Sequence, residues 1–96
     1  MKFEQFTEEG KTTFKPIGWL DTKTIPELTE ALGKIPDDTT ELTLDMQELE
    51  YISSSGLRQI VALHKKMNGS LTIINASKDI LDVLRMTGLI KKLNVK

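Results

Sequence analysis

The sequence predicts a single α/β domain over residues 1–96, with a mixed central sheet of about four to five strands and helices packed on it. Two observations carry this prediction. Residues 3–17 contain two short strand-like segments around a polar turn, which is typical of a hairpin. After residue 24, segments of helical period alternate with short apolar segments of strand character. The chain has no internal repeat, low-complexity segment or linker that would divide it.

The N-terminal elements come first. Residues 3–6 and 11–17 are the expected strands of the hairpin, and residues 8–10 are its polar turn. Residues 24–27, Thr-Ile-Pro-Glu, have the spacing of a capping box, with proline in the first turn where its missing N–H costs nothing. A helix should therefore begin there and end at Pro36. Its apolar stripe would consist of Leu28, Ala31, Leu32 and Ile35.

The middle of the chain is expected to hold a strand over residues 42–46, where leucine and methionine alternate with polar residues. Leu49 and Ile52 carry the apolar character on to three serines. From Leu57 to Met67, apolar residues recur at helical spacing, and the Asn-Gly pair that follows is typical of a left-handed helix end.

The C-terminal part should add a short buried strand over residues 71–74 and a third helix capped by Ser77. The Thr-Gly pair at residues 87–88 is expected to end that helix. Leu93 and Val95 would form a last edge strand.

Composition and charge exclude several classes of function. The net charge is −1 with both signs interspersed, so we expect no surface that holds a nucleic-acid backbone. The chain has no cysteine and one histidine, His64, so we expect no metal site, thiol catalysis or cofactor. No apolar stretch approaches the roughly 20 residues of a spanning helix, and the N-terminus lacks a signal region. We therefore expect a cytoplasmic domain without membrane insertion.

Three consecutive hydroxyls, those of Ser53, Ser54 and Ser55, stand where the second helix should begin. A single serine would suffice as an N-cap, which contributes about 1 kcal/mol. An exposed hydroxyl beside the unpaired N–H groups of a helix start is also a natural seat for a phosphate. The pattern alone leaves both roles open. Gly56 next to them favours close backbone packing or a special dihedral over contact with a ligand.

Enzyme activity is not predicted. Asp21 and Asp45 could be paired carboxylates, and a serine with His64 and an aspartate could form a hydrolase triad. However, His64 lies on the helix that the serines begin, roughly 15 Å from Ser54 at 1.5 Å per residue. That distance is far beyond hydrogen-bond reach.

Four segments together resemble the STAS domain family, which bacterial anti-sigma factor antagonists share with the cytoplasmic tails of sulfate transporters. They are residues 18–22 (Gly-Trp-Leu-Asp-Thr), 44–45 (Leu-Asp), 54–57 (Ser-Ser-Gly-Leu) and 85–89 (Arg-Met-Thr-Gly-Leu). Their order and separations, in a chain of this length, carry the resemblance over nearly the whole sequence.

The resemblance implies a regulatory role. In such antagonists a serine in this turn is phosphorylated by a serine kinase that is also the anti-sigma factor. By position that serine is Ser54, and the implied partners are this kinase and a serine phosphatase. Ser53 stands where the family usually has aspartate. This departure removes a negative charge beside the phosphoacceptor.

The implied partner-binding surface surrounds this turn. Trp19 is either a core residue or, beside Asp21 and Thr22, an exposed interface anchor, a role in which tryptophan is enriched. The full set of expected contact residues is Trp19, Asp21, Thr22, Asp45, Ser53, Ser54, Ser55, Gly56, Leu57 and Arg58.

Two other functions are compatible with the sequence. The chain could be a STAS subunit of a transporter or signalling assembly without a phosphorylation cycle. It could also bind a nucleotide weakly, although no glycine-rich phosphate motif supports this. The sequence does not predict the oligomeric state.

Overall fold

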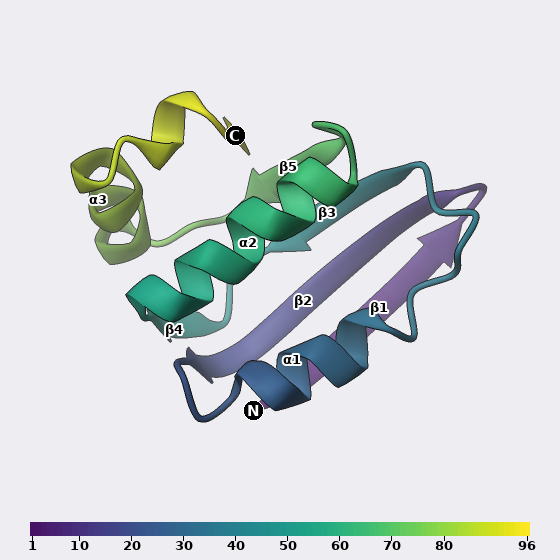
Figure 1. Cartoon of the computed structure of the whole chain (residues 1–96), viewed down its shortest axis with the longest axis horizontal. Helices are drawn as coiled ribbons and strands as arrows, with labels where there is room; N and C mark the ends of the chain where they lie inside the picture. Colours follow the sequence, from purple (N-terminus) through teal and green to yellow (C-terminus); the bar gives the residue numbers. More distant parts are fainter.

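The computed structural model describes all residues from 1 to 96 and has six strands in one mixed sheet. The strand order is β1-β2-β3-β5-β6, and β4 pairs separately with the end of β2. Helices α1 and α2 lie across one face of the sheet, and α3 lies beyond the end of β5 (Figure 1). The predicted α/β class with a mixed sheet is therefore confirmed, with one or two strands more than expected.

The N-terminal hairpin joins β1 (Lys2–Glu8) to β2 (Lys11–Leu20) in antiparallel register, with Glu8 opposite Lys11. Glu9 and Gly10 form its two-residue turn and both have positive φ, 49° and 78°. This is the geometry that matches the twist of paired strands. The predicted hairpin is confirmed, but both strands are longer than expected and β2 continues to Leu20.

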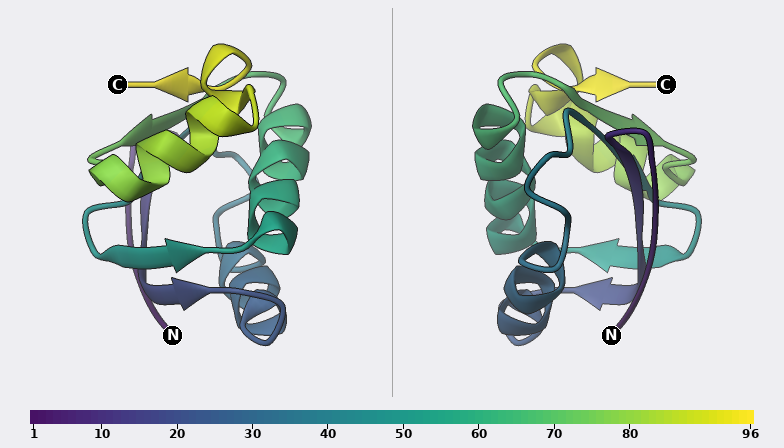
Figure 2. Two further views of the ribbon diagram at one scale, coloured as in Figure 1. Left: turned by 90° about the vertical axis from the view of Figure 1, so that its left-hand side faces the viewer. Right: turned by 90° about the vertical axis from the view of Figure 1, so that its right-hand side faces the viewer.

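Strand β2 has two parallel neighbours on its other side. Its first half pairs with β3 (Glu41–Asp45), and its end pairs with β4 (Leu49–Ile52), with a register shift at Gly18. Gly18 has φ 111°, which only glycine adopts readily. After this irregularity β2 and β4 run together toward the start of α2 (Figure 2).

Lys15 of β2 forms ion pairs with Glu4 of β1 and with Glu48, which directly precedes β4. The Nζ of Lys15 lies 2.9 Å from Glu48 Oε2 and 3.9 Å from Glu4 Oε1. The hydrogen bond to Glu48 raises the pKa of Lys15. The charged form of Lys15 is therefore favoured by its acidic neighbours.

Helix α1 (Ile25–Leu32) begins where predicted, with Pro26 in its first turn, but its capping and its end differ from the prediction. Thr24 is the N-cap residue, but its side chain makes no capping bond, so the predicted capping box is wrong. The helix also ends before Ile35, because Gly33 is a weak helix former and Pro36 forces the residue before it out of helical geometry.

The remaining elements follow the prediction, except for a short 3₁₀ helix that was not expected. Helix α2 (Ser54–Lys66) is capped by Ser53, and α3 (Lys78–Met86) is capped by Ser77. Between them lies β5 (Leu71–Ile74), followed after α3 by a short 3₁₀ helix (Leu89–Lys91) and β6 (Asn94–Val95). The predicted helix ends are confirmed by the positive φ of Asn68, Gly69 and Gly88. None of the helices has both the length and the apolar character that a membrane span needs.

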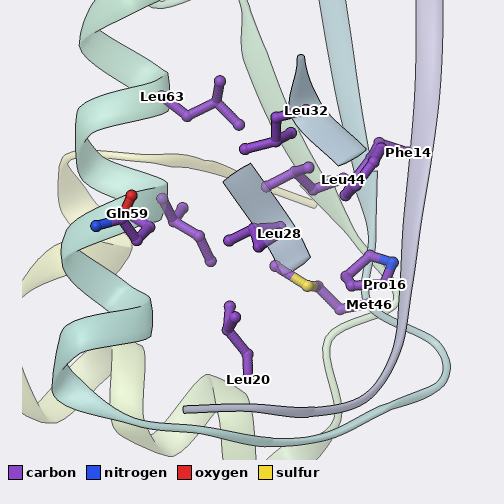
Figure 3. Close-up of a pocket in the computed structure, with 10 residues that line it drawn as sticks. Phe14, Pro16, Leu20, Leu28, Leu32, Leu44, Met46, Gln59 and Leu63 are labelled. Carbon is purple, nitrogen blue, oxygen red and sulfur yellow. The ribbon is translucent and has the colours of Figure 1, made fainter. Parts of the chain in front are cut away.

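Fifteen buried apolar side chains form one cluster between the sheet and the helices. Phe14 and Leu44 on the strands, and Met46 directly after β3, face Leu28 and Leu63 from the helices around a small void of about 10 Å³ (Figure 3). At about 10 Å³ this void has room for no more than one water-sized group, so it is too small for a ligand. The candidate site therefore lies at the surface.

Candidate functional site at the start of helix α2

The carboxyl ends of β2 and β4 bring two separate segments together. Leu20 pairs with Ile52, and the N–H of Ser53 donates to the Leu20 carbonyl at 2.9 Å. The loop after β2 therefore lies beside the start of α2. We call residues 53–56 the serine turn.

Ser53 is the structural serine of the turn. Its backbone is extended, with φ −87° and ψ 170°, and its Oγ accepts from the N–H of Gly56 at 3.1 Å. This bond satisfies one of the free N–H groups of the first helical turn. Ser53 alone therefore accounts for helix capping.

Ser55 connects the serine turn to the loop after β2. Its Oγ lies 2.9 Å from Ser53 Oγ and 2.9 Å from Thr22 Oγ1, and hydrogen-bonds to both. Thr22, Ser55, Ser53 and the Gly56 N–H thus form one chain of hydrogen bonds. Modification of Ser55 would break this connection.

Ser54 differs from both neighbours. It is the first residue of α2, it is exposed, and its hydroxyl makes no hydrogen bond within the chain. The first turn of α2 has no acidic residue, and the exposed Arg58, one turn further on, forms no ion pair. Residues four apart are neighbours on a helix surface. A negative group on Ser54 would therefore meet the positive helix end and a free guanidinium.

Gly56 is required by packing. A Cβ at this position would lie 2.9 Å from Leu20 Cγ and 3.1 Å from Ile52 Cγ1, inside van der Waals contact. The expectation of close backbone packing is confirmed. Leu57 is only 5% exposed and belongs to the core. Both residues are buried, Gly56 against Leu20 and Ile52 and Leu57 in the core, and they fix the position of the helix that carries Ser54.

Asp21 and Thr24 shape the loop after β2. Asp21 Oδ1 accepts from the N–H groups of Lys23 at 2.9 Å and Thr24 at 3.1 Å. Thr24 Oγ1 accepts from the Asp21 N–H and donates to the Trp19 carbonyl, both at 2.9 Å. The Asp21 carboxylate therefore holds the loop and positions Thr22 against Ser55.

Trp19 is 57% exposed, so its core interpretation is wrong. Its Nε1–H donates to Glu50 Oε2 at 3.2 Å, and its ring lies 5.2 Å from that of Tyr51, which is 45% exposed. Sequence reasoning missed Glu50 and Tyr51. Strand alternation could not have identified both residues, because two exposed residues in a row separate the buried Leu49 and Ile52.

Asp45 does not belong to this cluster. On β3 the buried Leu42 and Leu44 alternate with it, so its side chain lies on the opposite face of the strand. Its Oδ1 accepts from the Gln47 N–H at 3.0 Å and from Asn75 Nδ2 at 3.1 Å. These bonds run to residues just after β3 and β5 and not to the serine turn.

His64 is half-buried near the far end of α2. Helix α2 is continuous from Ser54 to Lys66, so the serines and the histidine are held apart along its axis. No serine–histidine pair forms.

Comparison with known proteins identifies the family of this chain. The STAS domain family matches residues 4–96. The anti-sigma-B factor antagonist of Staphylococcus aureus (strain NCTC 8325 / PS 47) is 30% identical over 93 residues, which are 93% of this chain and 86% of that protein.

Two solved structures share the fold. An anti-sigma factor antagonist from Mycobacterium paratuberculosis has a TM-score of 0.86 at 22% identity, covering 98% of this chain and 83% of that chain. The unphosphorylated form of the anti-sigma factor antagonist SpoIIAA has a TM-score of 0.79 at 14% identity, covering 99% and 88%. The family match and the Staphylococcus aureus relative together show that this chain is a member of the STAS domain family.

Proposed function

We propose that this STAS domain is an anti-sigma factor antagonist that binds a serine-kinase anti-sigma factor and is released when that kinase phosphorylates Ser54. A serine phosphatase would restore binding. The relative at 30% identity carries the name of an antagonist, which supports the functional class. The observation that carries the proposal is the free, exposed hydroxyl of Ser54 between two serines that are engaged in structure.

The domain itself should tolerate the phosphate. A phosphate adds roughly −2 charge, and a helix N-terminus favours negative charge by about 0.3–2 kcal/mol. Ser54 opens α2 and has no hydrogen bond to lose. Arg58, free of ion pairs and one turn away, offers a further favourable contact. The fold should therefore remain intact after modification.

A bound partner would respond differently. An acidic partner surface against Ser54 would repel the phosphate by about 4 kcal/mol per pair of unit charges at 4 Å. A close-packed surface would add the cost of removing water from the phosphate. The repulsion exceeds the gain at the helix start, so phosphorylation would shift the equilibrium toward release.

Serine in place of the family's aspartate at position 53 is compatible with this switch. Ser53 already caps α2 through the Gly56 N–H, and serine and aspartate cap about equally well. The neutral hydroxyl leaves less repulsion for a phosphate on the next residue. Kinase recognition would then rest on the exposed residues around the turn, Trp19 and Thr22 among them.

A binding assay tests the proposal. Candidate partners are the serine kinases encoded beside the gene, and binding to Ser54→Glu and Ser54→Ala is compared with the wild type. Ser54→Glu should release the partner, while Ser54→Ala should bind and no longer respond to ATP. Ser70→Glu is the matched control, since it makes the same charge change at an exposed serine before β5.

Equal binding of Ser54→Glu and wild type would overturn the switch. The STAS subunit of a larger assembly, without a phosphorylation cycle, would then be the leading function.

A further inference from the structure

Strand β1 is an open edge of the sheet. It has only β2 as a neighbour, and six of its seven residues are exposed. Such an edge presents a row of unpaired backbone N–H and C=O groups to any strand that approaches. Figure 1 shows β1 at the outer side of β2, away from β3 and β5.

The hydrogen bonds of β2 identify the β1 residues whose backbone N–H and C=O groups point away from β2. Gly10, directly before β2, and Gly18, in β2, are both even-numbered and bond on the side of β3 and β4: the Gly10 carbonyl accepts from the N–H groups of Thr40 and Glu41, and the Gly18 N–H donates to the Glu48 carbonyl. Odd-numbered β2 residues therefore bond to β1, as expected for Lys11, which closes the two-residue turn opposite Glu8. In this register the even-numbered β1 residues are paired with β2. The backbone N–H and C=O groups that point away from β2, toward the free edge, therefore belong to Phe3, Gln5 and Thr7.

A second copy of the chain fits this edge. A twofold axis at Gln5 would set Gln5 opposite Gln5 and Phe3 opposite Thr7, so that every outward backbone group gains a partner. The same register sets Lys2 of each copy opposite Glu8 of the other. Neither side chain has an ion pair within the chain.

Other registers are disfavoured by charge. A shift of two residues in one direction places Glu4 opposite Glu4, and a shift in the other direction places Glu4 opposite Glu8. Like charges directly opposite each other destabilise paired strands. In the favoured register Phe6, which is 63% exposed, lies diagonally across from Phe6 of the second copy, within the reach of aromatic rings.

We propose that this protein forms a homodimer through antiparallel pairing of its β1 strands, with two Lys2–Glu8 ion pairs fixing the register. The serine turn follows β4, on the other side of β2, so both copies keep it free. The dimer would present two serine turns. This inference does not depend on the proposed function.

Charge reversal tests the register. Sedimentation velocity over a concentration series should show a monomer–dimer equilibrium for the wild type. Lys2→Glu and Glu8→Lys should each weaken dimerisation about tenfold or more, because two attractive pairs become repulsive. An equimolar mixture of the two variants should form a heterodimer, and the double variant should dimerise like the wild type. Lys91→Glu, at an exposed lysine outside β1, is the control for net charge.

A second measurement locates the interface. Amide hydrogen exchange at Phe3, Gln5 and Thr7 should slow as concentration rises, because their outward N–H groups become bonded in the dimer. A wild type that stays monomeric at the highest concentration reached would overturn the proposal. The proposal would also be overturned if the charge reversals left dimerisation unchanged or if the two variants did not associate when mixed. Unchanged exchange at these three amides would overturn it as well.

Discussion

At the scale of single residues, three adjacent serines have three different environments. The sequence identified the helix start but could not assign roles within it, because serine is equally good as a cap and as a phosphoacceptor. The assignment depends on contacts with distant residues: Thr22, 33 positions away, engages Ser55, and Leu20 holds the Ser53 backbone. Only Ser54 is left without a partner.

The first prediction separates the serines by stability. Ser53→Ala should lower the free energy of unfolding by about 1 kcal/mol, because the Gly56 N–H loses its cap. Ser54→Ala should change it by less than about 0.5 kcal/mol, since its hydroxyl makes no bond. Urea denaturation measures both. An equal loss in the free energy of unfolding for the two variants would mean that the capping residue has been misassigned.

The second prediction concerns Gly56. In most helices glycine to alanine stabilises by about 0.5–1 kcal/mol. Here Gly56→Ala should destabilise by about 1–3 kcal/mol, because the new Cβ would overlap Leu20 and Ile52. Urea denaturation of Gly56→Ala measures this loss of stability. Ser54→Ala, two residues away on the same helix, is the control variant. A gain in stability would show that helix α2 lies further from β2 and β4 than the structure places it.

At the scale of elements, local patterns predicted the hairpin, the strands and most helix ends. The predictions failed where a local motif competed with longer contacts. Thr24 matches a capping box, but its hydroxyl instead bonds to Asp21 and Trp19 in the preceding loop. The pairing of β4 with β2 also escaped prediction, because it depends on a register shift at Gly18 that no local pattern specifies.

The third prediction tests the phase of α2. Leu57→Ala or Ile60→Ala should destabilise by about 2–4 kcal/mol, because both side chains are buried in the core. Arg58→Ala, on the exposed face of the same turn, should cost less than about 0.5 kcal/mol. Chemical denaturation of the three variants decides this, and a loss under about 1 kcal/mol at Leu57 would indicate a wrong helix phase.

At the scale of the whole molecule, the candidate functional features lie at one end of the sheet. The ends of β2 and β4 carry the exposed Trp19–Tyr51 pair and lead into the loop and the serine turn. The resemblance to the STAS family placed Trp19 and Ser54 near each other, whereas Tyr51 and Glu50 required the sheet pairing to be seen. Asp45, which the sequence grouped with them, is held instead by Gln47 and Asn75.

The fourth prediction uses Trp19, the only tryptophan, as a reporter. Because its indole is 57% exposed, titration with the partner should change its emission if this end of the molecule forms the interface. Tyr51→Ala should weaken binding, since the ring supports one side of the indole. An unchanged spectrum for a complex verified by gel filtration would place the interface elsewhere.

Site-resolved mass spectrometry of the protein after incubation with the proposed partner kinase and ATP tests directly whether Ser54 is the phosphoacceptor. We predict phosphate on Ser54, none on Ser53 or Ser55, and no modification of Ser54→Ala. Phosphate on Ser53, on Ser55 or only outside the serine turn would contradict the account.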